Sequence, residues 1–181
     1  MIIEEVLKNK FTQIPGRFIN FVQLLELCYC FPRVPSQKLK TMVYVIRKEH
    51  FNAAHRLFNP AWTEEKNQEV FGPCANNNWH GHNFELIVTV KGKPDPDTGF
   101  SYDLKQLGDL IKSEIIDKVD HKNLNLDVDF MEGKLASCEI LVMEFWKILA
   151  PKILASSTSA TLHKIHLIET NKNSVEYFGE N

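Results

Sequence analysis

The feature that most limits the possible fold is a run of β-branched and apolar residues at 83–90, Asn-Phe-Glu-Leu-Ile-Val-Thr-Val. Such a run is typical of a β-strand. Two histidines, His80 and His82, come directly before it. Because side chains two positions apart project from the same face of a strand, we expect both imidazoles to point to one side. That arrangement suits a metal ion, and a thiol, Cys74, lies a few residues upstream.

The hydrophobic pattern of the remaining sequence predicts further strands and two helices. The strands are expected at 43–51, 83–90, 162–169 and 175–178. The first helix covers 104–115 with Asp103 as its N-cap, and the second begins near Ser137 and ends at Pro151. Residues 170–173 form a hairpin turn between the last two strands. The order β-β-α-α-β-β indicates an α+β protein in which helices cover an antiparallel sheet.

The first 41 residues differ in character from the rest of the chain. We expect Met42 to be the natural start; the alternative is that residues 1–41 form a weakly structured extension or a short helix. The most apolar run, 18–31, is shorter than the roughly 20 residues that span a bilayer. Asn20 and Glu26 interrupt that run and no small-residue cleavage site follows it, which argues against a signal peptide.

Composition excludes some classes of function. The formal net charge is −2, so nothing indicates binding to nucleic acid or to an anionic membrane. Four cysteines show no spacing of a disulfide framework, and reduced thiols in a cytoplasmic protein are the simpler interpretation.

A third histidine, His55, follows the first predicted strand and completes a possible metal site with His80 and His82. Three imidazoles with one open position are the pattern of a catalytic zinc site. The alternative is that His80 and His82 are surface residues beside a turn, because a His-x-His sequence is common by chance. No function is assigned to His50, His163 and His166, of which His163 and His166 are expected on opposite faces of a strand.

Cys74 lies in a Gly-Pro-Cys loop close to the expected metal site. A nearby positive charge lowers the pKa of a thiol and makes the thiolate available as a base or nucleophile. The alternative is a small buried hydrophobic residue. Cys138 lies at the start of the second predicted helix, where packing or capping explains it as well as chemistry does.

Two polar loops are expected, one containing residues 59–66 and one at 120–125, which ends the first helix. The second loop carries Asp120 and His121 as neighbours. A carboxylate that contacts an imidazole fixes its tautomer and raises its basicity, although adjacent Asp-His pairs are common. Glu169 ends a strand, where its carboxylate is either exposed to solvent or anchors a ligand.

Taken together, these residues resemble the 6-pyruvoyl tetrahydropterin synthase family and its close relative, 6-carboxytetrahydropterin synthase. The matching stretches are Phe51-Asn-Ala-Ala-His55-Arg-Leu57, Phe71-Gly-x-Cys74 followed by Trp79-His80-Gly-His82-Asn, Asp120-His121-Lys-Asn-Leu124 and Glu169-Thr170. They cover nearly all of residues 42–180, so 42–181 is expected to be the pterin synthase domain.

The resemblance implies one zinc ion per subunit, held by His55, His80 and His82. It implies the tunnelling fold, a four-stranded antiparallel sheet with two helices on one face. Three such subunits close a barrel and two trimers stack as a hexamer, so we expect a homo-oligomer with sites between subunits.

The resemblance also implies the reaction. Cys74 would be the catalytic base, with Asp120 and His121 as its partners in proton transfer. Glu169 would bind the guanidine-like edge of the pterin and Glu139 would be a second pterin contact. The substrate would be 7,8-dihydroneopterin triphosphate, converted to 6-pyruvoyl tetrahydropterin for tetrahydrobiopterin biosynthesis. The alternative product is 6-carboxytetrahydropterin of the queuosine pathway, which the five-residue gap between Cys74 and His80 disfavours.

Two departures from the family pattern affect this region. The second helix starts with Ser137-Cys138-Glu139-Ile140, where the family usually has Thr-Thr-Glu-Asn or Ser-Thr-Glu-Asn, so Glu139 is kept but its neighbours differ. Pro73 stands where Lys or Arg often precedes the cysteine. The other classes considered are a non-catalytic pterin- or metal-binding module and a structural zinc protein, which would need a fourth protein ligand.

Overall fold

The computed structural model of the chain describes residues 41–157 and 159–180. The predictions for residues 1–40, namely an upstream extension, a short helix or a leader, lie outside the described residues. Within the described part of the chain, no helix is both long and apolar enough to cross a bilayer.

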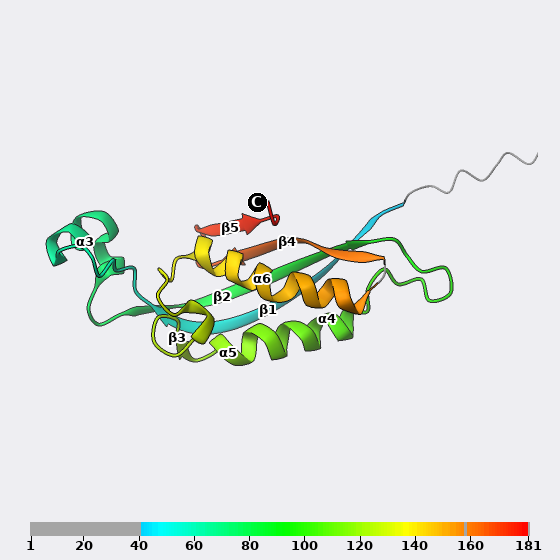
Figure 1. Cartoon of the computed structure of the whole chain (residues 1–181), viewed down its shortest axis with the longest axis horizontal. Helices are drawn as coiled ribbons and strands as arrows, with labels where there is room; N and C mark the ends of the chain where they lie inside the picture. Colours follow the sequence, from blue (N-terminus) through cyan, green and yellow to red (C-terminus); the bar gives the residue numbers. More distant parts are fainter. Residues whose placement is uncertain (1–40, 158, 181) are drawn as a thin grey trace, which may run out of the picture. The chain divides into compact units, whose positions relative to one another are not determined.

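The strands form a single sheet in the order β3-β1-β2-β4-β5 (Figure 1). The long strands pair antiparallel, which confirms the four expected strands, and β3 adds a short parallel pairing to β1. Their bounds are β1 Val43–His55, β2 His80–Gly92, β3 Lys122–Asn123, β4 Ala160–Ile168 and β5 Ser174–Tyr177.

Two helical segments cover one face of the sheet (Figure 1). The first is continuous through α4 (Leu104–Ile111), a π-helical turn (Lys112–Ile116) and α5 (Asp117–Val119). As expected, it begins at an N-cap, since the Asp103 carboxylate accepts hydrogen bonds from two backbone N–H groups of the first turn. The second is α6, Cys138–Ser156.

The core lies between these helices and the inner face of β1, β2 and β4. Phe51 and Phe84, on neighbouring strands, stack with ring centroids 4.8 Å apart, and Phe145 of α6 meets Phe51 edge-on at 6.2 Å. All three rings are fully buried. This aromatic cluster fixes the inner face of the strands close to the residues that form the site.

Helix α6 does not end at Pro151, as the sequence had indicated, but runs on to Ser156. Proline has no N–H to donate to the carbonyl one turn earlier, which usually disrupts a helix. Here Leu149 and Ile153, on either side of the proline, are both fully buried in the core. Burial of apolar side chains beyond the proline outweighs the lost hydrogen bond.

The polar loop expected at 59–66 is partly helical, because α3 covers Glu64–Phe71. Thr63 caps this helix by accepting a hydrogen bond from the Lys66 N–H, and the first turn carries Glu64 and Glu65, which favour a helix N-terminus. The loop at 120–125 contains β3.

The expectation that His163 and His166 lie on opposite faces of a strand is wrong. The pairing of β2 with β4 shifts between Thr89 and Val90, where β4 carries an extra residue. His163 contacts Tyr44 and His166 lies 3.7 Å from Glu176, both on the outer face. The bulge resets the alternation of side chains, and periodicity alone does not reveal it.

Candidate active site

Three histidines converge where β1 ends and β2 begins. His55 pairs with His80 in the register of the two strands, and His82 lies two positions further on the same face. The ring centroids are 4.5 to 5.1 Å apart. One ring nitrogen from each residue lies within 4.8 Å of the others. The structure therefore confirms the expectation that the imidazoles point together.

The donor atoms suit a divalent metal ion such as zinc. His55 Nδ1 lies 2.8 Å from the Ala136 carbonyl oxygen, which fixes the proton on Nδ1 and leaves the lone pair of Nε2 facing the cluster. His55 Nε2 and His80 Nδ1 are buried and make no hydrogen bond within the described part of the chain. Desolvation lowers the pKa of all three imidazoles, so they are neutral and able to bind metal at neutral pH.

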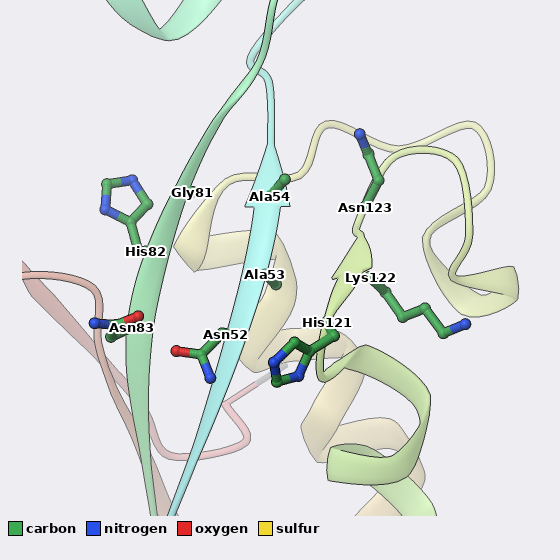
Figure 2. Close-up of a pocket in the computed structure, with 9 residues that line it drawn as sticks. All are labelled: Asn52, Ala53, Ala54, Gly81, His82, Asn83, His121, Lys122 and Asn123. Carbon is green, nitrogen blue, oxygen red and sulfur yellow. The ribbon is translucent and has the colours of Figure 1, made fainter.

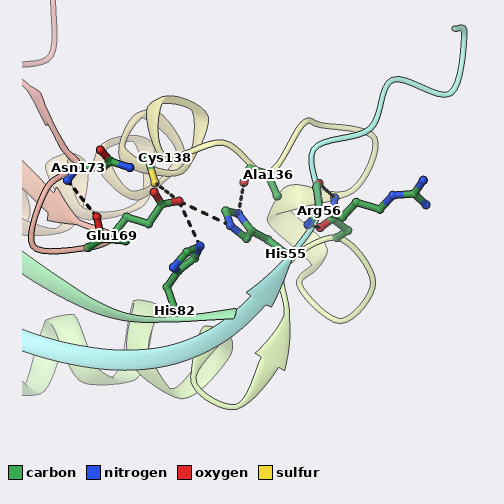
Figure 3. Close-up of polar contacts among 9 residues, drawn as sticks. His55, Arg56, His82, Ala136, Cys138, Glu169 and Asn173 are labelled. Carbon is green, nitrogen blue, oxygen red and sulfur yellow. Dashed lines mark hydrogen bonds and ion pairs between the residues drawn. The ribbon is translucent and has the colours of Figure 1, made fainter. Parts of the chain in front are cut away.

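Glu169 lies beside this cluster, directly after β4 (Figure 3). Its Oε1 is 3.6 Å from Nε2 of both His55 and His82. The Cys138 thiol donates to the same oxygen, with Sγ 3.4 Å away. The Glu169 N–H donates to the Asn173 carbonyl at 3.1 Å, so the hairpin turn fixes the backbone of this residue.

A cavity of about 390 Å³ opens on this side of the cluster. It is lined by His55 of the histidine cluster and by the Cys74 loop, the start of α6 and the β4–β5 hairpin, including Cys74, Cys138, Glu139 and Glu169. The structure thus brings the expected thiol, both expected pterin contacts and one metal ligand to a single cavity.

Cys74 is part of a 3-10 turn, Gly72–Ala75, in which Pro73 occupies the first turn and is compatible with its geometry. Two hydrogen bonds hold this turn against the end of β1. The Leu57 N–H donates to the Cys74 carbonyl at 2.9 Å, and Nε of Arg56 donates to the Ala75 carbonyl at 2.9 Å. The chain segment after His55 therefore positions the Cys74 thiol relative to the three histidines.

Asp120 and His121 form the expected pair, with Asp120 Oδ2 2.9 Å from His121 Nδ1. Both are attached to one residue of β1, since the Asn52 N–H donates to Asp120 Oδ1 at 2.8 Å and the His121 N–H donates to the Asn52 carbonyl at 2.6 Å. His121 adopts a left-handed backbone conformation with φ 57°. The hydrogen bond from the Asn52 N–H has the largest effect and lowers the pKa of the Asp120 carboxyl. Desolvation partly opposes this, and the His121 ring lowers the pKa further.

This pair does not reach the cavity that Cys74 lines. His121 instead lines a separate hollow with Asn52, Asn83 and neighbouring residues of β1, β2 and β3 (Figure 2). Its side chain is 77% exposed. Within one chain, the structure brings the three histidines, Cys74, Glu139 and Glu169 together. His121 instead lies in the second hollow, which His82 also lines.

Two of these contacts were not predicted from the sequence. Nothing in the pattern around Asn52 indicates that its backbone holds the Asp120–His121 pair, because the partners are far apart in the sequence. For Cys138, the sequence allowed capping or packing, but the structure shows that Ser137 caps α6 and that the Cys138 thiol contacts Glu169.

The geometry agrees with the comparisons to known proteins. A family model described as 6-pyruvoyl tetrahydropterin synthase matches residues 44–180. The chain belongs to the 6-pyruvoyl tetrahydropterin synthase family. Among curated members of that family, the chain is 38% identical to 6-pyruvoyl tetrahydrobiopterin synthase of Pongo abelii, over 75% of this chain and 91% of that protein. It is 35% identical to the enzyme of that name from Dictyostelium discoideum, over 76% of this chain and 97% of that protein.

Solved structures of the 6-pyruvoyl tetrahydropterin synthase family share this fold. The family member from Caenorhabditis elegans superposes with a TM-score of 0.68 at 33% identity, covering 77% of this chain and 97% of that one. The Plasmodium falciparum member matches with a TM-score of 0.50 at 17% identity, covering 76% of this chain and 99% of that one, which supports the fold alone. The α+β tunnelling fold expected from the sequence is thus confirmed, with β3 as an additional short strand.

Proposed function

We propose that this pterin synthase is a zinc-dependent lyase that converts 7,8-dihydroneopterin triphosphate to 6-pyruvoyl tetrahydropterin and releases triphosphate. The observation that carries the proposal is the convergence of three imidazoles beside a cavity lined by Cys74 and Glu169. Family membership and the names of the curated relatives support the same reaction. The catalytic domain would be residues 42–181.

His55, His80 and His82 would hold one zinc ion per subunit. Bound zinc supplies Lewis-acid stabilisation of negative charge on substrate oxygens and so acidifies adjacent C–H bonds. The chain's own groups then carry out the proton transfers. We propose that Cys74, as the thiolate, removes a proton from a side-chain carbon of the substrate. Triphosphate leaves by elimination, and the accompanying redox change is internal to the substrate.

Glu169 and Glu139 would bind the pterin. A carboxylate accepts two parallel hydrogen bonds from the guanidine-like edge of a pterin, which fixes the orientation of the ring. Glu169 is suited to this because it lies in the same cavity as Cys74 and next to the metal cluster. A pterin bound by Glu169 would extend its side chain toward Cys74 and the three histidines.

Asp120 and His121 would complete the site of a neighbouring subunit. Hydrogen bonds to Asn52 hold the Asp120–His121 pair, yet His121 faces a hollow that does not contain Cys74. We therefore propose a homo-oligomer, a trimer or hexamer, in which His121 of one subunit shuttles protons at the cavity of another. We also propose a cytoplasmic enzyme whose partners do not include nucleic acid or membrane.

The product assay tests the proposal. Purified protein is incubated with 7,8-dihydroneopterin triphosphate, with and without a chelator, and the pterin is identified by mass spectrometry. We expect 6-pyruvoyl tetrahydropterin, lost on chelation and restored by zinc. His80→Ala should lose zinc and activity together, whereas Cys74→Ala should keep zinc and lose activity. Loss of zinc from the Cys74 variant would contradict this division of roles.

The second candidate is 6-carboxytetrahydropterin synthase, which acts on the same substrate. The gap between Cys74 and His80 and the names of the curated relatives favour the pyruvoyl product. Release of acetaldehyde with the carboxylated pterin would establish the alternative. A protein that binds zinc and pterin but forms neither product would be a non-catalytic binding module.

A further inference from the structure

The start of helix α6 contacts both the cluster of three histidines and Glu169, the expected pterin-binding residue. The Ala136 carbonyl, just before the helix, lies 2.8 Å from His55 Nδ1. Two residues later, the Cys138 thiol donates to Glu169 Oε1 (Figure 3). The same carboxylate oxygen faces Nε2 of His55 and of His82, each at 3.6 Å. Oε1 is therefore surrounded by groups from α6, β1 and β2.

The Cys138 thiol is available as a hydrogen-bond donor because it does not cap the helix. The Ser137 hydroxyl accepts from the Ile140 N–H and is the N-cap. Cys138 is 9% exposed. Its burial, followed by the charge of Glu169, raises the pKa of the thiol, so the sulfur keeps its proton and donates it to the carboxylate.

The backbone and the tip of Glu169 are held separately. The hairpin fixes the backbone through the Asn173 carbonyl, and Cys138 is the hydrogen-bond donor from α6 to the carboxylate. A glutamate side chain loses considerable rotamer freedom when it is ordered. A carboxylate that is oriented in advance loses less entropy when it accepts two parallel hydrogen bonds from a ligand.

We propose that Cys138 is a positioning residue that orients the Glu169 carboxylate for pterin binding. The proposal rests on the proposed function, because it takes Glu169 to be the pterin anchor. It assigns a role to the position at which this chain departs from the usual family sequence, Cys138 in place of Thr. On this proposal, the S–H group of Cys138 contributes to the orientation of Glu169, in addition to the packing of the Cys138 side chain.

A matched pair of variants separates the donor from the packing. Cys138→Thr and Cys138→Val have nearly the same shape, but only threonine carries a hydroxyl donor. We expect Cys138→Val to raise KM for 7,8-dihydroneopterin triphosphate about fivefold to tenfold, which corresponds to about 1 to 1.4 kcal/mol, the net contribution of one ordinary hydrogen bond from a weak thiol donor. Cys138→Thr should stay within about twofold of wild type, since it restores a donor. The kcat and the zinc content should be unchanged in both.

A second readout that does not depend on turnover is the binding of unsubstituted pterin to the zinc-loaded protein. Fluorescence quenching measures this binding. We expect the dissociation constant to change in the same ratio as KM. Should a β-branched variant fail to fold, Cys138→Ser and Cys138→Ala make the same comparison with smaller side chains.

Equal weakening by both members of a pair would show that packing alone matters and would overturn the inference. So would a fall in kcat with KM unchanged. If wild-type protein turns substrate over and binds pterin, but the paired Cys138 variants have the same KM and dissociation constant, only the role of Cys138 fails. If wild-type protein does neither, the proposed function fails, and the role of Cys138 fails with it.

Discussion

Of the three site histidines, His55 is buried and His80 and His82 are half-buried, so a positive charge on any of them has reduced solvation. Desolvation is the largest effect on the pKa of His55, His80 and His82, and each pKa lies below the ordinary value of 6.5. Repulsion among the rings lowers the pKa further, and Glu169 acts in the opposite direction with a smaller effect on His55 and His80. The folded chain therefore keeps the imidazoles in the form that binds metal, and it resists their protonation.

This resistance predicts how the stability of metal-stripped protein depends on pH. Above about pH 6.5 neither the folded nor the unfolded chain protonates these residues, so they give no pH dependence. Below it, the unfolded chain binds protons first, because its histidines have the higher pKa. The free energy of unfolding should thus fall as pH drops from 6.5 toward the lowered pKa values of the folded state.

Urea unfolding of the metal-stripped protein between about pH 7 and pH 5 measures this slope, above the range in which most carboxylates titrate. His80→Asn removes one of the titrating groups and should make the slope shallower. A free energy of unfolding that stays constant or rises on acidification would show that the imidazoles are not desolvated in the folded chain.

Asp120 gives a second prediction for a single residue. Asparagine at this position keeps an oxygen for the Asn52 N–H but presents an NH₂ group to the His121 ring. The ring must then adopt the other tautomer or lose its partner, which removes the orientation and the added basicity. We expect Asp120→Asn to fold normally and to lower kcat about 10²-fold or more.

Asp120→Ala is the control, because it also removes the acceptor for the Asn52 N–H. It should cost about 1 kcal/mol of stability in addition to the loss of activity. Steady-state kinetics and urea unfolding on both variants distinguish the two effects. Full activity of Asp120→Asn would exclude Asp120 from the proton-transfer steps.

Secondary structure was predictable wherever one local pattern decided it. Alternation along β2 correctly placed His80 and His82 on one face, and Asp103 correctly marked the start of α4. The errors arose where a distant contact decides. Core packing carries α6 past Pro151, and a bulge against β2 turns His163 to the outer face.

The site was predictable to a similar degree. Cys74, Glu139 and Glu169 share one cavity, as the resemblance implied. The contact from Cys138 to Glu169 joins residues that are far apart in the sequence, so no local pattern could indicate it. The outward orientation of His121 is equally nonlocal, because it depends on the bonds to Asn52 in β1.

The course of α6 gives a prediction at the level of the element. If the helix is continuous beyond Pro151, Ile153 is a core residue and Leu154, which is 61% exposed, is not. Ile153→Ala should reduce the free energy of unfolding by about 2–5 kcal/mol, the usual cost of truncating a buried aliphatic side chain. Leu154→Ala should change it by no more than about 0.5 kcal/mol. Equal effects in a denaturant titration would contradict the continuous helix.

At the scale of the assembly, residues 41–157 and 159–180 present surfaces that suit association. On the outer face of the sheet, Tyr44 is 50% exposed and Ile46 is 58% exposed. β1 is 13 residues long, but it pairs with β3 only at Ala53 and Ala54. Within the described residues, most of that edge of β1 therefore has no strand partner. Exposed sheet edges tend to pair with other strands, and closure into a barrel removes them.

Association would also join the two halves of the proposed site, which gives a prediction at the level of the assembly. Cys74→Ala and His121→Ala should each be inactive alone. When the two variants are co-expressed, some interfaces combine an intact Cys74 from one subunit with an intact His121 from its neighbour. Random mixing in equal amounts makes about a quarter of the sites intact, so we expect about a quarter of wild-type activity.

Co-expression of wild-type chain with the double variant Cys74→Ala/His121→Ala is the matched control. If each site takes the two residues from different subunits, an intact site needs two wild-type neighbours, and again about a quarter of the sites are active. If one chain supplied both residues, this mixture would retain about half of the activity and the mixture of single variants would have none. The two mixtures therefore have equal activity only when the site lies between subunits, and the rate of product formation per subunit decides between the arrangements.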